Sequence, residues 1–273
     1  MTSRDLTIGE TRVELLSDGI FETGRDVIVH RGGEAERQRV LDAWGEAPLR
    51  LDVNVGLLRG PRGIELVDAG TGSSWGAGLG HARAALAERG VAPGAVDRVF
   101  LTHFHGDHAL GLLDGDAPAL PGAEVLVPEA DLAFFTDASQ RTRLPAARRS
   151  AFDVARRVVA AYGNRLHGLP YGPVLPGVEL LPLPGHTPGQ GGYLFTAGDA
   201  GLLMLADALH LGDLQPGDPD IGLAFDVDPA AAAVTRRTIL ARAAAEGWVV
   251  GGGHLPGFGR VSADASGFRI AWL

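Results

Sequence analysis

A run of metal-binding residue types lies near the middle of the chain. Residues 102–108 read Thr-His-Phe-His-Gly-Asp-His, which places three histidines and one aspartate within six positions. If the segment is extended, His103 and His105 point to the same side, because side chains alternate along a strand. The glycine that follows allows a turn, so Asp107 and His108 can face a second point a few ångströms away. The run predicts a metal site, since Zn²⁺ accepts imidazole and carboxylate ligands.

Three further candidate ligands follow later apolar segments, namely His186, Asp207 and His254. A single histidine in a loop is more often structural than a ligand. Here five of the nine histidines and two aspartates all stand where a strand is expected to end, which is where rigid scaffolds usually carry functional residues. A divalent ion lowers the pKa of a bound water to about 7 and stabilises the oxyanion that forms on attack. The pattern therefore indicates metal-dependent hydrolysis.

The composition excludes several other chemistries. The 273 residues include 24 basic and 33 acidic ones, a formal net charge of −9, whereas a nucleic-acid-binding protein would show a basic face. The absence of cysteine removes disulfides, thiolate nucleophiles and cysteine-containing zinc sites. All 24 basic residues are arginine, so neither a Schiff-base lysine nor a P-loop lysine is present. We expect a small-molecule substrate and no nucleic-acid partner.

The charge pattern also bears on location and assembly. The N-terminal residues carry charges throughout and lack the apolar stretch of a secretory signal. No segment reaches the ~18 uninterrupted apolar residues of a membrane span. We expect a cytoplasmic protein without a membrane partner. The arginine-rich segment Arg141 to Arg157 should form a solvated helix face, and the alternatives are a lid over the site or the surface of a homodimer.

The elements that would position these residues follow a β-rich, helical, β-rich, helical order along the chain. Apolar runs bounded by turn residues predict strands at 12–16, 49–58, 63–67, 96–101, 124–127, 178–183, 192–195, 202–205 and 248–250. Helical spacing and terminal residue types predict helices at 79–89, 128–135, 144–161 and 229–246, the last capped by Asp228. No repeat or linker interrupts this order. It predicts one α/β domain over residues 1–273, in which helices cover two sheets.

Several parts of this pattern together resemble the metallo-β-lactamase superfamily in its dinuclear hydrolase form. They are His-Phe-His-Gly-Asp-His at 103–108, Pro-Gly-His-Thr-Pro-Gly at 184–189, Asp207 and His254. Asp68, in Leu-Val-Asp-Ala-Gly, looks like the family's early aspartate. The resemblance runs from about residue 53 to residue 254. It implies an αββα sandwich that holds two zinc ions, or other divalent transition metals, at one edge.

The resemblance also implies a role for each candidate residue. His103, His105 and His186 would hold the first zinc, Asp107, His108 and His254 the second, Asp207 would bridge both, and Asp68 would orient a ligand. A metal-bridging hydroxide would attack the substrate, with Asp107, Asp207 and His210 as the catalytic residues. In the lactonases that this chain resembles, a tyrosine tends to stand where this chain has His210. His210 is therefore either a donor to the substrate or a structural residue. The family's glycine pair after the run is replaced by residues 109–112, Ala-Leu-Gly-Leu, which puts the loop shape in doubt but not the ligands.

Within the superfamily, the sequence favours the branch of lactonases and methyl parathion hydrolase. True metallo-β-lactamases mostly use a cysteine or lack the bridging aspartate. Glyoxalase II types carry a C-terminal helical domain, but only 19 residues follow His254 here. The RNA-processing branch has an inserted domain or a basic arm, and sulfur dioxygenases of this fold use one iron with fewer ligands. The segments 127–132 and 213–229 resemble methyl parathion hydrolase and its lactonase relatives.

The sequence thus predicts a dinuclear zinc hydrolase that opens a lactone or cleaves an ester, with acyl-homoserine lactones among the candidate substrates. Phosphotriester hydrolysis by the same centre is one alternative, and a non-catalytic ligand-binding member of the fold is another.

The substrate pocket should be apolar with a few aromatic residues. The candidates are Phe104, Phe134, Phe135, Trp44 and Phe258, of which Phe104 is preferred because it lies between two ligands.

Overall fold

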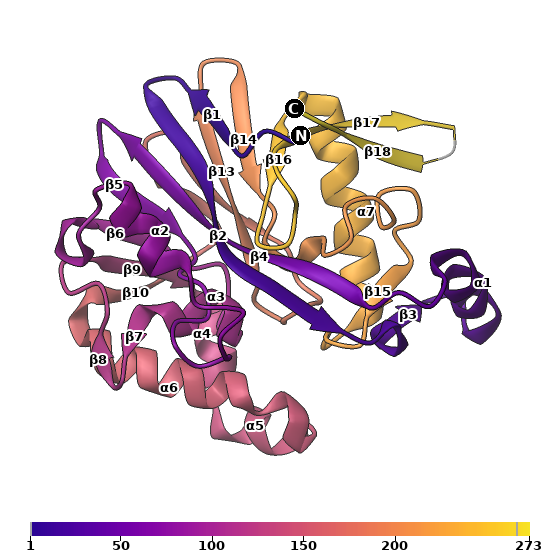
Figure 1. Cartoon of the computed structure of the whole chain (residues 1–273), viewed down its shortest axis with the longest axis horizontal. Coiled ribbons are helices and arrows are strands. Elements are labelled where there is room, and N and C mark those ends of the chain that lie inside the picture. Colours follow the sequence, from indigo (N-terminus) through magenta and orange to yellow (C-terminus); the bar gives the residue numbers. More distant parts are fainter. Residues whose placement is uncertain (1, 266) are drawn as a thin grey trace.

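Two seven-stranded sheets lie face to face in the computed structural model, which describes residues 2–265 and 267–273 (Figure 1). The first sheet has the order β1 (Asp5–Ile8), β2 (Thr11–Thr23), β4 (Leu49–Gly60), β5 (Gly63–Val67), β6 (Arg98–Phe100), β9 (Glu124–Pro128) and β10 (Leu166–Leu169). The second has the order β11 (Gly172–Leu175), β12 (Val178–Pro182), β13 (Gly191–Ala197), β14 (Ala200–Met204), β16 (Val249–Gly251), β17 (Gly259–Asp264) and β18 (Gly267–Trp272). Each half of the chain therefore builds one sheet.

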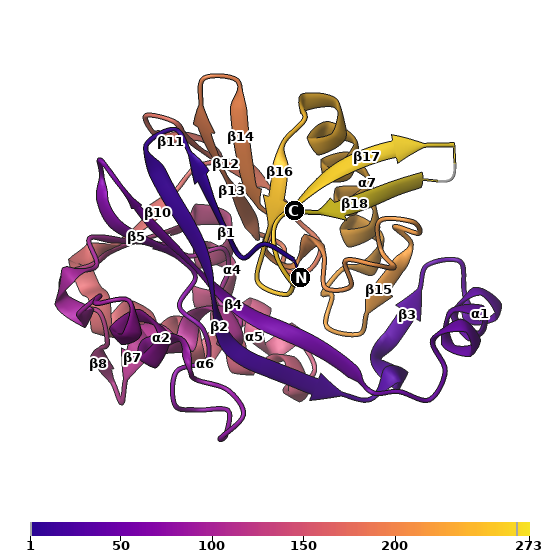
Figure 2. The same ribbon diagram turned by 45° about the horizontal axis from the view of Figure 1, so that its top comes forward.

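The helices flank the two sheets, although not all of them lie on an outer face. They are α1 (Glu34–Trp44), α2 (Ala82–Glu88), α3 (Gly106–Ala109), α4 (Glu129–Thr136), α5 (Ala138–Arg143), α6 (Ser150–Tyr162) and α7 (Pro229–Glu246). Two small sheets of two strands each pair β3 (Ile28–His30) with β15 (Ile221–Leu223), and β7 (Leu113–Asp114) with β8 (Ala117–Pro118). Figure 2 shows α1 and β3 at one end of the molecule, beside β15.

Three apolar layers hold this arrangement together. Between the sheets, the ring of Phe100 packs edge-on against Phe195, with 5.5 Å between ring centroids. On the outer face of the first sheet, α2, α4 and α6 bury residues such as Phe152. On the outer face of the second sheet, α7 buries Ile239 and Leu240. Burial of these layers removes apolar surface from water, the main stabilising contribution to folding. The predicted αββα sandwich is confirmed.

Local sequence patterns located several elements well. The strand β5 has the predicted bounds, and α7 begins at Pro229, where the Asp228 side chain accepts hydrogen bonds from the backbone N–H groups of Ala230 and Ala231 at 3.0 Å. The long helix predicted from residue 144 was wrong at its start. Pro145 disfavours helical backbone at Leu144, and residues 146–148 form a separate 3₁₀ turn, so the helix begins at Ser150.

Several elements had no counterpart in the sequence analysis, among them the helix α1 and the hairpin of β17 and β18. The helix α1 is rich in charged residues and buries only Leu41, so it shows little apolar periodicity. The hairpin of β17 and β18 alternates between half-buried and exposed positions without a strong apolar run. No helix in the described ranges combines the length and the hydropathy that a membrane span requires.

Candidate metal centre

Five strands from both sheets end at one edge of the sandwich, and each leads into a candidate site residue. The strands β5 and β6 are parallel neighbours in the first sheet, and β14 and β16 are parallel neighbours in the second. In the first sheet, β5 leads to Asp68 and β6 leads to the 103–108 run. In the second sheet, β12 leads to His186, β14 to Asp207 and β16 to His254. The rigid sheets thus fix loops from distant parts of the chain around one point.

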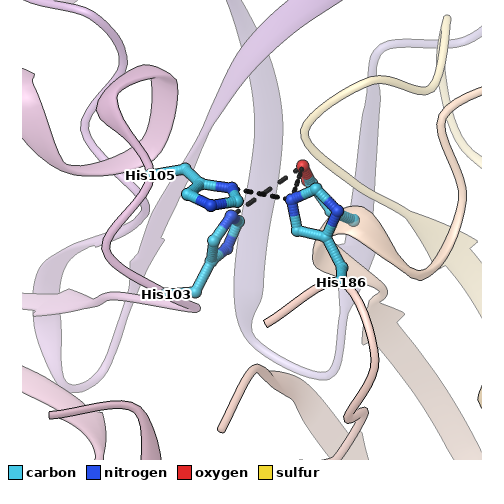
Figure 3. Close-up of side chains that lie close together, drawn as sticks. His103, His105 and His186 are labelled. Carbon is cyan, nitrogen blue, oxygen red and sulfur yellow. Dashed lines mark hydrogen bonds and ion pairs between the residues drawn. The ribbon is translucent and has the colours of Figure 1, made fainter. Parts of the chain in front are cut away.

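The first group of potential ligands consists of His103, His105, His186 and Asp207. One potential ligand atom from each lies within 4.8 Å of all the others. The Nε2 atom of His186 lies 2.7 Å from His105 Nδ1 and 3.1 Å from Asp207 Oδ2. His103 Nε2 lies 3.8 Å from the same carboxylate oxygen. Figure 3 shows the three rings turned toward a common point.

The second group consists of Asp107, His108, Asp207 and His254, and it satisfies the same 4.8 Å criterion. His108 Nε2 lies 3.0 Å from Asp207 Oδ1, and His254 Nε2 lies 3.2 Å from Asp207 Oδ2. Asp107 Oδ2 completes the group at 3.5 Å from His254 Nε2. Asp207 therefore belongs to both groups. The structure brings together all seven residues that the sequence analysis selected as ligands.

Several polar atoms at the centre of these groups lack a hydrogen-bond partner. Within the described residues, His103 Nε2, His108 Nε2 and Asp207 Oδ1 are buried and make no hydrogen bond, since the 3.0 Å approach of His108 Nε2 to Asp207 Oδ1 is an ion-pair contact without hydrogen-bond geometry. A buried polar atom without a partner costs roughly 1–3 kcal/mol, so such atoms rarely cluster without a reason. Nitrogen and carboxylate donors are the set that Zn²⁺ and similar ions accept. The donor set fits two divalent cations that share Asp207.

Contacts behind the rings fix which nitrogen faces the centre. His108 Nδ1 donates to Asp68 Oδ2 at 2.8 Å, and His254 Nδ1 donates to the carbonyl oxygen of Asp52 at 2.6 Å. His103 Nδ1 contacts Thr102 Oγ1 at 3.0 Å. With Nδ1 engaged, the lone pair of Nε2 is left to face the cluster. Asp68 thus lies behind a candidate ligand and outside both ligand groups, as the resemblance implied.

The electrostatics of the cluster favour added positive charge. Burial disfavours protonation of His186, but Asp207 and Asp226 outweigh this effect and raise its pKa to about 9. Burial and the neighbouring His186 lower the pKa of His105 to about 3. Burial also opposes ionisation of Asp207, yet the surrounding histidines, led by His108, hold its pKa well below the usual range. A buried carboxylate ringed by histidines that cannot all be protonated is a site suited to cations.

A buried carboxylate and arginine behind His186 were missed by the sequence analysis. Asp226 Oδ1 accepts a hydrogen bond from His186 Nδ1 at 3.0 Å. The fully buried Arg236 lies 3.6 Å from Asp226 Oδ2 and donates to the carbonyl oxygen of Ala208, next to Asp207. Asp226 lies in the segment 213–229, which resembles methyl parathion hydrolase, so the resemblance could have drawn attention to it. Arg236 lies on α7, and its burial follows only from tertiary packing.

A second missed carboxylate, Asp131, ties two ligand loops together. It is fully buried on α4, where one oxygen accepts from the backbone N–H of Phe104 at 3.0 Å. The other oxygen accepts from Thr187 Oγ1 at 2.5 Å. Burial raises the pKa of Asp131 to about 7, although both hydrogen bonds oppose that shift. Asp131 therefore links the loop of His103 and His105 to the loop of His186.

A cavity of about 390 Å³ opens onto the cluster. His105, Asp107, His186, Asp207, His210 and His254 line its floor, and most of the wall is apolar. His210 stacks on His254 with 4.9 Å between ring centroids, and its Nε2 lies 3.1 Å from Asp207 Oδ2. Its backbone N–H is held by Gln215 Oε1 at 2.7 Å. His210 thus reaches the cavity beside the two ligand groups.

The aromatic wall differs from the one expected. Of the five candidates, Phe135 lines the cavity, whereas Phe104, Phe134, Phe258 and Trp44 are packed in apolar clusters away from the lining. Phe104 faces away because it alternates with His103 and His105, which point into the site. The other aromatic lining residues are Phe21, Trp75 and Phe225. The ring of Phe21 lies near both of the other rings, with ring-centroid distances of 5.6 Å to Trp75 and 6.4 Å to Phe225.

Comparison with known proteins places this site in a family. Among curated relatives, the human metallo-beta-lactamase domain-containing protein 1 is 35% identical over 212 residues, which are 75% of this chain and 62% of the relative. The chain therefore spans less than two thirds of that relative's length. Among solved structures, the hydrolase AbOPH superposes with a TM-score of 0.89 and 22% identity over 100% of this chain and 97% of its own.

AidC, described as a dizinc quorum-quenching lactonase in complex with a product, gives a TM-score of 0.87 at 22% identity over 100% of this chain and 98% of its own. At this level of identity, the two likenesses show a shared fold. The family model described as the metallo-beta-lactamase superfamily matches residues 49–254, most of the chain and every candidate ligand. The chain belongs to the metallo-beta-lactamase superfamily.

Proposed function

We propose that the chain is a metal-dependent hydrolase whose centre holds two divalent ions, with zinc as the expected metal. The observation that carries the proposal is the pair of ligand groups that share Asp207, with buried unpartnered atoms aimed at their centres. His103, His105 and His186 would hold one ion, and Asp107, His108 and His254 the other. When bound, such ions lower the pKa of water and stabilise negative charge on an attacked oxygen.

The side chains of this protein would place the substrate against that centre. Asp107 and Asp207 both line the cavity. The carboxylate of Asp107 can accept a proton during hydrolysis, whereas Asp207, whose pKa is held low by the surrounding histidines, would stay ionised and hold the two ions. The apolar wall of Phe21, Trp75 and Phe135 would take the non-reacting part of the substrate and exclude water from it. The ester or lactone carbonyl to be attacked would lie over the histidines.

A lactone or carboxylic ester is the substrate class we propose. AidC, which shares this fold, is titled a lactonase, and the cavity can accommodate an acyl chain beside the ligand groups. Acyl-homoserine lactones are one candidate within that class. A phosphotriester would need the same charge stabilisation at the attacked centre, so hydrolysis of phosphotriesters is the alternative outcome of the test.

Metal analysis combined with a substrate panel tests this proposal. We expect two divalent ions per chain, with activity that a chelator removes and that added Zn²⁺ or another divalent transition metal restores. The panel consists of an acyl lactone, an aryl ester and an aryl phosphotriester, and we expect the lactone or the ester to be hydrolysed with the highest kcat/KM. Activity that is unchanged after complete metal removal would overturn the proposal, and metal binding without hydrolysis of any substrate would favour the non-catalytic alternative.

Asp68 provides a test of the contacts behind the ligands. Replacing Asp68 with asparagine removes the negative charge that accepts from His108 Nδ1, while the side-chain shape stays similar. We expect metal affinity or activity to fall by ~10–100-fold, the usual effect of such a partner. Metal titration and kcat/KM measure the effect. Wild-type metal affinity together with wild-type activity would show that Asp68 does not orient the ligand.

A further inference from the structure

The cavity wall contains a cationic side chain, that of Arg148, in addition to the histidine cluster. Arg148 ends a short 3₁₀ turn of residues 146–148, between α5 and α6, and lines the cavity next to the loop that carries Ala224 and Phe225. Its Nη2 donates to the carbonyl oxygen of Ala224 at 2.8 Å. In the part of the chain that the structure describes, no carboxylate lies within ion-pair distance of this guanidinium.

Most of the residues that line the cavity together with Arg148 are apolar. Leu144, Ala151, Phe225 and Val227 line the same cavity, and Ser150 is the neutral polar side chain among the lining residues. A guanidinium has five N–H donors, and one hydrogen bond to a carbonyl leaves most of them to water in the free protein. A purely apolar substrate would displace that water without replacing its hydrogen bonds, which is unfavourable. The cavity therefore suits a substrate that brings an acceptor to Arg148.

The surrounding charge favours an acceptor that is anionic. Between residues 141 and 157 the chain has six arginines and one acidic residue, although its overall formal charge is −9. Two of the six are paired, since Arg141 lies 3.3 Å from Asp153 and Arg157 lies 3.0 Å from Asp116. This segment thus forms a positive region on an acidic protein, and such a field raises the association rate of anions.

From this geometry we infer that Arg148 binds a carboxylate carried by the substrate at a position remote from the bond that is hydrolysed. This inference rests on the proposed hydrolase function and narrows it to esters or lactones whose acyl chain ends in an acid group. A planar guanidinium can bind a carboxylate through two parallel hydrogen bonds, which gives both affinity and orientation. The carbonyl oxygen of Ala224 would help to hold the guanidinium in place.

A matched pair of esters tests the inference. The 4-nitrophenyl ester of hexanoic acid and the mono-4-nitrophenyl ester of adipic acid have the same chain length and differ in the terminal carboxylate. We expect the metal-loaded wild type to prefer the adipate ester. Arg148→Gln should lower kcat/KM for that ester by about 10–100-fold, the effect of losing a charged hydrogen bond, and leave the hexanoate ester nearly unchanged. The loss should fall mainly on KM, because the contact lies away from the reacting bond.

A control variant and a binding measurement complete the test. Arg143→Gln removes the same charge from the same segment at an exposed position outside the cavity lining, and it should leave the preference intact. Calorimetry with adipate and hexanoate measures the preference without hydrolysis. If neither ester is hydrolysed but adipate binds better in an Arg148-dependent manner, the binding inference stands and the hydrolase proposal fails. Equal effects of Arg148→Gln on both esters and on both acids, or none, would overturn the inference.

Discussion

Replacement of Asp207 with alanine should abolish binding of at least one metal ion and lower hydrolytic activity by more than the ~10–100-fold that loss of an outer contact typically costs. Asp207 is the residue that the two ligand groups share, and its carboxylate oxygens lie 3.0–3.2 Å from His108, His186 and His254. Without it, both groups lose a ligand and the negative charge that offsets two divalent cations. The effect should therefore exceed that of Asp68→Asn.

Two further variants separate charge from coordination. Asp207→Asn keeps one oxygen of similar position but removes the charge, so we expect it to retain more metal than the alanine variant while activity stays low. Asp213→Asn, at an exposed position six residues later, changes the net charge by the same amount and should behave as the wild type. Metal content per chain and kcat/KM are the measurements. Two ions and full activity in Asp207→Ala would refute a shared ligand.

Replacement of His210 with alanine should harm lactone hydrolysis far more than hydrolysis of aryl esters or aryl phosphotriesters. His210 lines the cavity beside Asp207, and its Nδ1 is buried without a hydrogen-bond partner among the described residues. Its imidazole can donate a hydrogen bond to the substrate oxygen or to the departing alkoxide. General acid assistance of this kind contributes ~10²–10⁴-fold, and it matters most for a poor leaving group such as the alkoxide of a lactone.

The leaving group is the internal control in this experiment. Nitrophenolate departs without assistance, so the aryl ester and the aryl phosphotriester should lose little activity in His210→Ala, and metal content should stay at the wild-type level. His210→Gln, which keeps a side-chain donor, should retain more lactone activity than the alanine variant. An equal loss on all three substrates, or no loss on any, would assign His210 a structural role instead.

Local sequence was sufficient to select the candidate ligands, and it located much of the secondary structure. The run at residues 102–108 carries four ligand candidates in direct succession, so its chemistry is visible without knowledge of the fold. The bounds of β5 and the start of α7 follow from apolar runs, turn residues and a capping aspartate, which act over a few positions. The family resemblance then supplied the αββα sandwich, because the spaced ligands match the superfamily over most of the chain.

The cavity wall and the contacts behind the ligands depended on tertiary structure. Phe21 lies on β2, Trp75 in the loop before α2, and Phe225 in the loop before α7, yet the three form one wall. Phe104, which adjacency to the ligands favoured, turned out to face the core. Sequence neighbours on an extended segment point to opposite sides, so closeness in sequence was misleading for side-chain direction.

The buried charged residues behind the candidate ligands also depended on tertiary structure. Asp131, Asp226 and Arg236 are ordinary charged residues in the sequence, and nothing in their local pattern distinguishes them from solvent-exposed ones. Each is buried because packing of α4 or α7 on the sheets brings it to a ligand loop, where a hydrogen bond or ion pair offsets the cost of removing it from water. Periodicity records which face of an element is apolar, but contacts between residues far apart in the sequence are decided only when the two sheets and their helices pack together.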